Sequence, residues 1–108
     1  MTSGVPGRAA HTIVAVQFRA PMTRTQVETA FGPEAPAFTK LPGLRWKFWT
    51  FNEETRDFMG VYLFENSGAV KAYLDGPVVP TLRKQFGDVR VETYAVLPEL
   101  SRTTRAPL

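Results

Sequence analysis

The chain has 108 residues, which is enough for one domain with a hydrophobic core but too few for two. It contains no cysteine and one histidine, His11, which excludes disulfides, thiolate metal sites and a multi-histidine metal centre within one subunit. No apolar run reaches the roughly 18 residues of a membrane span, and residues 1–10 lack an apolar signal-peptide core. We therefore expect a cytoplasmic protein that does not bind membranes.

Most of the formal net charge of +3 comes from residues near the two ends of the chain. Arg8 near the start, and Arg102 and Arg105 offset by Glu99 near the end, account for two of the three positive charges. No cluster of Lys and Arg interleaved with aromatic residues is present, so we expect no nucleic-acid partner.

The first part of the chain predicts a leader, a strand and a helix. Residues 1–10 hold two glycines and a proline among several small residues, which is typical of a flexible leader. Residues 11–19 are rich in β-branched side chains and predict a strand. Thr23 and Gln26 form a capping-box pattern for a helix that ends near Phe31.

An aromatic hairpin forms the centre of the chain, with strands expected over residues 44–51 and 58–64. The turn between them is polar and highly charged. With the strand period of two, the residues of the first strand divide into two faces: Leu44, Trp46, Phe48 and Thr50 on one, and Arg45, Lys47, Trp49 and Phe51 on the other. Aromatic residues on both faces indicate that both faces are covered. Gly60 leaves space above the second strand, which predicts that another group comes close there.

The remaining elements complete an α+β fold. A short helical piece is predicted over residues 34–40, and further helices over residues 68–74, with Asn66 or Ser67 as the cap, and 79–86. A last strand follows over residues 88–97, and Pro98 closes it. The order is the βαββαβ ferredoxin-like plait, a four-stranded antiparallel sheet with helices on one face. We assign residues 11–98 to this domain and residues 99–108 to a C-terminal tail.

Such a sheet leaves its second face without helices. Here that face still carries aromatic and aliphatic groups over an area larger than a monomer normally exposes. A face-to-face homodimer is the simplest way to cover it, and the C-terminal tail is a candidate for the interface.

The hairpin and the helix after it resemble a known family. LPGLRWKFWT, followed about ten residues later by GVYLF and then by AVKAYLDG, resembles the YdhR-like monooxygenases of the dimeric α+β barrel superfamily. An NEPLS-like segment of that family corresponds to residues 97–101. The resemblance covers residues 12–105.

The resemblance implies a homodimer in which the two sheets form a barrel, with a pocket in each subunit for a hydrophobic, aromatic or polyketide-like molecule. Related members of the superfamily oxidise phenols to quinones with molecular oxygen and without a cofactor, and others cyclise, isomerise or decarboxylate. Phe51 stands where relatives often carry an acidic residue, and Pro77 where a histidine can follow the helix. Both departures remove an ionisable group, so any acid–base work has to come from other positions.

Lys47 and Trp49 are the candidate catalytic residues. They share a strand face about 7 Å apart and belong to the family-like motif. A buried lysine can hold a phenolate, which makes an electron-rich ring reactive toward oxygen, and Trp49 can stack on that ring or donate from its indole N–H. In the alternative interpretation Lys47 pairs with Glu92 across the barrel and Trp49 is part of the core.

The candidate substrate-binding residues are polar or aromatic positions on the strands: Gln17, Trp46, Phe48, Phe51, Tyr62 and Tyr94. Gln17 can donate to a substrate carbonyl, satisfy a neighbouring backbone group or point at the dimer partner. Trp46 and Phe48 are expected to face the helices and line the pocket. Tyr62 and Tyr94 can orient a ligand or serve only in packing. No metal ligands and no cofactor-binding motif are predicted.

Three functions are consistent with these features. The first is a cofactor-independent monooxygenase that acts on a hydrophobic aromatic or polyketide-like molecule. The second is a cofactor-free cyclase or isomerase, which would need no titrating base. The third is a dimer that binds a small molecule without turnover.

Overall fold

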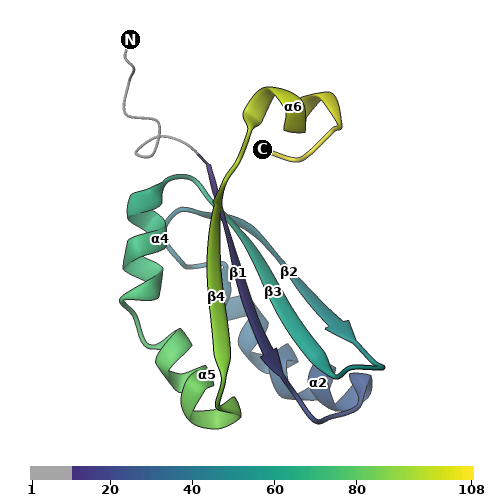
Figure 1. Cartoon of the computed structure of the whole chain (residues 1–108). Helices are drawn as coiled ribbons and strands as arrows, with labels where there is room; N and C mark the ends of the chain where they lie inside the picture. The colour runs from purple at the N-terminus through teal and green to yellow at the C-terminus, as the bar shows by residue number, and fades with distance from the viewer. Residues whose placement is uncertain (1–10) are drawn as a thin grey trace.

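The computed structural model describes residues 11–108 (Figure 1). The expected leader, residues 1–10, lies outside the described residues. The elements, in chain order, are β1 (Thr12–Arg19), α2 (Arg24–Phe31), the 3₁₀ helix η1 (Gly32–Glu34), α3 (Ala35–Phe38), β2 (Leu44–Asn52), β3 (Asp57–Phe64), α4 (Ser67–Leu74), α5 (Val78–Phe86), β4 (Val89–Ala95) and α6 (Pro98–Thr103). Within residues 11–108, no helix has the length and apolar character of a membrane span.

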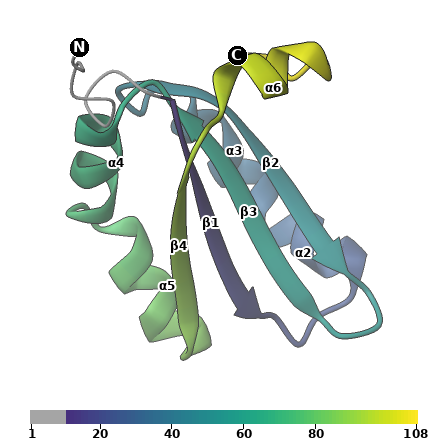
Figure 2. The same ribbon diagram turned by 45° about the horizontal axis from the view of Figure 1, so that its top comes forward.

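The four strands form one antiparallel sheet in the order β2-β3-β1-β4. Helices α4 and α5 pack beside β1 and β4, whereas α2 and α3 lie behind β2 and β3 on the same face (Figure 2). The other face carries no helix. This arrangement confirms the predicted ferredoxin-like α+β fold with helices on one face.

The alternation of β1 decides where the core lies. Val14, Val16 and Phe18 are almost completely buried, whereas Ala15 and Gln17 between them are only partly buried. A strand that buries every second residue has one face on the core and one face open. The core therefore fills the layer between the sheet and the helices.

One prediction about the central hairpin is wrong. Trp46 and Phe48 do not face the helices. A register shift between Leu44 and Trp46 brings Leu44 opposite Phe64, while Lys47 pairs with Tyr62 on the covered face. The alternation of the two faces from Trp46 onward is as predicted. Because Lys47 lies with the buried Tyr62 on the covered face, Trp46 and Phe48 lie on the open face.

Local signals set the starts of two helices. The Thr23 side chain accepts from the Gln26 backbone N–H, and the Gln26 side chain accepts from the Thr23 N–H, which confirms the capping box. The Asn66 side chain caps α4 by accepting from the Ala69 N–H. Before β2, Gly43 adopts φ 79° and lies against Ala69 of α4.

The last residues of the chain form an element that the sequence did not predict. Strand β4 ends at Ala95, and Pro98 begins the short helix α6, which lies beyond the end of the sheet (Figure 1). The chain then turns back, and the indole Nε1 of Trp46 donates to the backbone oxygen of Pro107 at 2.8 Å. The tail is thus fastened to the open face of β2.

Candidate functional site: an aromatic pocket around Lys47

A pocket of about 490 Å³ lies between the covered face of the sheet and the helices. Strands β1, β2 and β3 form its floor, and η1, α3 and α5 form its walls. Most of its lining is apolar. Its polar lining residues are Glu34, Lys47, Tyr62, Thr81 and Gln85. An apolar cavity of this size with a few convergent polar groups is typical of a small-molecule site.

The amine of Lys47 lies among three aromatic rings in this pocket. Its Nζ is 3.4 Å from the ring centroid of Trp49, 3.8 Å from that of Phe38 and 4.4 Å from that of Tyr62. Trp49 and Tyr62 come from adjacent strands, while Phe38 comes from α3, which crosses over them. Among the described residues, no carboxylate forms an ion pair with this amine. The expected alternative pairing with Glu92 is absent, because Glu92 lies on the open face of β4, opposite Ala15.

Gly60 provides the space that the Lys47 side chain occupies. Gly60 pairs with Trp49 across the hairpin. A Cβ atom built at Gly60 would lie 3.1 Å from Cε of Lys47 and 3.4 Å from Cε1 of Tyr62. The group predicted to approach this glycine is therefore the lysine side chain itself.

Burial changes the acid–base properties of Lys47. Loss of solvent around the amine lowers its pKa from 10.5 to about 7, against the smaller opposite effect of the Glu34 carboxylate. The surrounding rings favour the ammonium form through cation–π attraction, which opposes the effect of burial. A substantial fraction of the amine is then neutral near pH 7, so Lys47 can act as a base or as a nucleophile.

A second polar feature lies behind the pocket. The Tyr73 hydroxyl of α4 donates to the Tyr62 hydroxyl at 2.6 Å, and both side chains are buried. Burial raises the pKa of Tyr62 far above its usual value, with Tyr73 adding to the effect. Burial also raises the pKa of Tyr73 to about 12, although its hydrogen bond to Tyr62 acts in the opposite direction. Both phenols are therefore protonated at neutral pH, and this bond uses one of their two protons.

The structure separates seven of the eight predicted site residues into two groups, and Phe51 lies apart from both. Lys47, Trp49 and Tyr62 line the pocket. The residues on the open face of the sheet lie outside it: Gln17, Trp46, Phe48 and Tyr94. The role of these four in substrate binding stays a prediction.

Two of the open-face residues have polar partners. Arg90 donates from Nη2 to the Gln17 side-chain oxygen at 3.4 Å. Tyr94 is 53% exposed, and its pKa is raised by a hydrogen bond with Glu92. In the single chain, Gln17 and Tyr94 are therefore both engaged in contacts with polar side chains at the surface.

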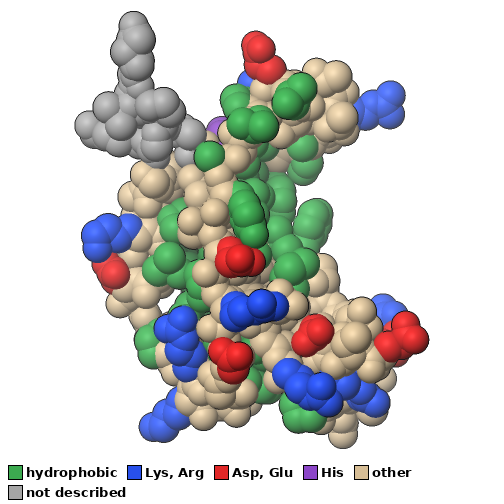
Figure 3. Space-filling model, in the orientation of Figure 1, with side chains coloured by type: hydrophobic (Ala, Val, Ile, Leu, Met, Phe, Trp, Pro, Cys, Tyr) green, Lys and Arg blue, Asp and Glu red, His purple; other side chains and the backbone are tan. Residues whose placement is uncertain are grey.

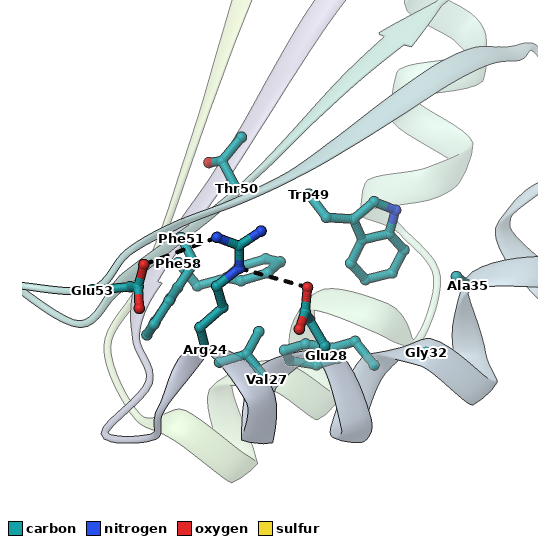
Figure 4. A pocket seen from close by; sticks show the side chains of 11 residues that line it. Arg24, Val27, Glu28, Gly32, Ala35, Trp49, Thr50, Phe51, Glu53 and Phe58 are labelled. Atoms are coloured by element: carbon teal, nitrogen blue, oxygen red, sulfur yellow. Dashed lines mark ion pairs between the residues drawn. The ribbon is translucent and has the colours of Figure 1, made fainter.

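Phe51 lies on the covered face but belongs to a neighbouring hollow of about 570 Å³ between α2 and β2 (Figure 4). Trp49 lines both spaces. In this hollow the Arg24 guanidinium pairs with Glu28 at 3.6 Å and with Glu53 at 4.0 Å. The side chains of these ion pairs are mostly exposed, whereas the Lys47 amine in the other pocket is largely buried.

The sequence reading missed three residues of the site. Phe38, Glu34 and Tyr73 were not among the candidates, because only the packing of α3, η1 and α4 on the sheet brings them to Lys47 and Tyr62. Nothing in the sequence indicated that the hydroxyl of Tyr73 would bond to that of Tyr62. Within residues 11–108, no three acidic or histidine side chains come together as a metal site would require.

The fold is shared with solved structures of low sequence identity. The NE2512 protein of unknown function from Nitrosomonas europaea superposes with a TM-score of 0.64 at 14% identity, covering 84% of this chain and 93% of that chain. SnoaB, a cofactor-independent oxygenase from Streptomyces nogalater, superposes with a TM-score of 0.62 at 15% identity, covering 83% and 99%. A "putative antibiotic biosynthesis monooxygenase" from Deinococcus radiodurans gives 0.60 at 13% identity, covering 80% and 91%.

A comparison with curated proteins gives no significant match. The family model described as "Putative mono-oxygenase ydhR" matches residues 13–107, which is nearly all of the described chain. The chain therefore belongs to the ydhR mono-oxygenase family.

Proposed function

We propose that this protein is a cofactor-independent monooxygenase that oxidises an electron-rich aromatic molecule in the Lys47 pocket. One observation carries the proposal: an amine with a pKa of about 7 lies in an aromatic pocket of about 490 Å³. Family membership and the fold shared with a cofactor-independent oxygenase support the reaction class.

The chemistry assigned to Lys47 is deprotonation. Its neutral amine takes the proton of a phenol, and the ammonium formed stays beside the phenolate and offsets its charge. The electron-rich ring then reacts with molecular oxygen at the carbon para to the phenolate oxygen. A new C–O bond forms at that carbon, its C–H bond breaks and releases a proton, the O–O bond breaks, and the second oxygen atom leaves as water. One phenol and one O₂ give one quinone and one water, so no further reductant is needed.

The aromatic residues around the amine position the substrate. Trp49 and Phe38 present ring faces and edges against which a planar substrate can stack. Because the pocket is largely apolar, it excludes water from the phenolate and from reactive oxygen intermediates. We assign no catalytic role to Phe51, since it lines the neighbouring hollow rather than this pocket.

We also propose a homodimer that covers the open sheet face. On this face Trp46 stacks on Phe48 at 4.7 Å between ring centroids, and Phe48 is 57% exposed. In Figure 3, hydrophobic side chains gather in the middle of the molecule, below α6 and above the charged groups.

Sedimentation of the purified chain tests this homodimer. The wild type should have twice the monomer mass, and Phe48→Glu should shift the measured mass toward that of the monomer. The control Lys71→Glu, on α4, should leave the mass unchanged.

Oxygen uptake with a panel of phenols and naphthols tests the reaction. The expected result is one O₂ consumed per quinone formed, with one atom of ¹⁸O₂ in the product, and loss of turnover in Lys47→Met. Lys71→Met is the matched control, because Lys71 is exposed and paired with Asp75. If the same product forms under nitrogen without gaining oxygen, the protein is a cyclase or isomerase. Binding without any product would make it a ligand-binding protein.

A further inference from the structure

The surroundings of Lys47 differ from those of an ordinary surface lysine. Lys71, for comparison, has a side chain that is 78% exposed and pairs with Asp75 at 2.8 Å. That pairing raises the pKa of Lys71, so its nitrogen keeps its proton. The Lys47 nitrogen instead lies over aromatic rings, and no ion pair is formed with it among the described residues. Its lone pair is not committed to a permanent partner.

The geometry holds this amine inside the pocket. Cε of Lys47 rests over Gly60, and the hairpin rather than a loop carries both residues. Besides Lys47, the titratable groups that line the same pocket are Glu34 from η1 and Tyr62 from β3. The polar residues that α5 contributes, Thr81 and Gln85, are uncharged. An apolar ligand that fills the cavity would therefore meet one amine, one carboxylate and one phenol.

We infer that Lys47 forms an imine with the aldehyde or ketone group of an apolar ligand held in this pocket. The amine nitrogen attacks the carbonyl carbon, a C–N bond forms, and the carbonyl oxygen takes up a proton. The resulting carbinolamine then loses its hydroxyl group and the remaining N–H proton as water. Nothing is oxidised or reduced, and the step requires no other reactant.

This activity goes beyond the proposed oxygenation. It uses the same amine but needs no oxygen and no phenol. A buried amine with a lowered pKa is the usual form of a lysine that reacts with carbonyls. Burial supplies this condition here, because the pKa of Lys47 falls to about 7.

The test is reductive trapping under nitrogen. The protein is incubated with 2-naphthaldehyde and sodium cyanoborohydride, which converts an imine into a stable secondary amine. Intact mass should show one addition equal to the mass of the aldehyde less one oxygen atom, and peptide mapping should place it on Lys47. At pH 7 this labelling should be at least about tenfold faster than labelling of Lys71, because far more of the Lys47 amine is neutral.

Two variants sharpen the test. Lys47→Arg keeps a cation in the pocket but cannot form the imine, so the fast addition should disappear while slow labelling of Lys71 remains. In Glu34→Gln the carboxylate that raises the pKa of Lys47 is removed, so the pH at which trapping reaches half its maximum should move downward. This shift would not follow if Lys47 were merely one of several accessible amines.

Labelling of Lys47 that is no faster than that of Lys71 would overturn the inference. Its failure is separable from failure of the proposed function. Oxygen uptake without trapping would leave a monooxygenase whose lysine acts only as a base. Trapping without oxygen uptake would leave a carbonyl-binding lysine and remove the monooxygenase.

Discussion

Replacing Lys47 by methionine should stabilise the protein below neutral pH. The pKa of this amine is 10.5 in its ordinary state and about 7 in the folded protein. Below pH 7 the folded protein must hold a charged amine in a desolvated site, whereas methionine fills the same space without charge. Methionine also makes favourable contacts with aromatic rings such as Phe38 and Trp49.

The sign follows from proton binding. Between pH 7 and 10.5 the unfolded chain binds a proton that the folded protein does not, so the free energy of unfolding of the wild type rises with pH. A pKa lowered from 10.5 to about 7 corresponds to a penalty of at most about 5 kcal/mol below pH 7. Partial contact with solvent and the cation–π contacts reduce it, and we expect on the order of 2 kcal/mol.

Urea unfolding followed by tryptophan fluorescence measures this difference. The free energy of unfolding of Lys47→Met should exceed that of the wild type most at pH 6, and this difference should shrink toward pH 10. The tyrosines Tyr62 and Tyr73 titrate in both proteins, so their effect cancels in the difference. In the control Lys71→Met, the difference in the free energy of unfolding from the wild type has the opposite sign. The raised pKa of Lys71 means that its contribution is present at neutral pH and is lost only as pH rises through the folded value.

A difference between Lys47→Met and the wild type that stays constant from pH 6 to 10 would refute the reasoning. So would a variant that is less stable than the wild type at pH 6. Either result would mean that the aromatic rings, rather than desolvation, control the charge state of Lys47. The role of this amine as a base near neutral pH would then lose its physical support.

Three further substitutions and one control variant test packing and helix capping by urea unfolding. Tyr73→Phe should cost about 1–3 kcal/mol, since it leaves the buried Tyr62 hydroxyl without its partner; unchanged stability would contradict the bond. Gly43→Ala should cost on the order of 2 kcal/mol because of its φ of 79° and the neighbouring helix. Gly32→Ala, with helical φ and open space around it, is the control and should be neutral or stabilising. Thr23→Ala should cost about 1 kcal/mol through loss of the capping box, and equal stability would show that the cap contributes little.

Much of the fold could be predicted from the sequence because its signals are local. The alternation in β1, the capping box at Thr23 and the polar turn of the hairpin each depend on residues only a few positions apart. The short helix α6 escaped prediction. Its sequence, PELSRT, has no apolar periodicity to mark it, and only the proline at its start is a recognisable helix signal.

The candidate site was predicted only in part. Lys47, Trp49 and Tyr62 came from strand motifs, and the structure brings them together. Trp46 and Phe48 were expected in the same pocket, but a strand exposes alternate residues on opposite faces. Choosing the wrong face as the covered one therefore misplaced both.

The sequence by itself determined the strands, the helices other than α6 and their order, because period, caps and turn residues act over a few neighbouring positions. Only the tertiary structure decided which face of β2 the helices cover, since that depends on pairing with Tyr62 and Phe64 across the hairpin. It also decided the charge state of Lys47. A pKa of about 7 requires water to be removed by groups distant in sequence, such as Phe38 on α3, and no local pattern encodes that desolvation.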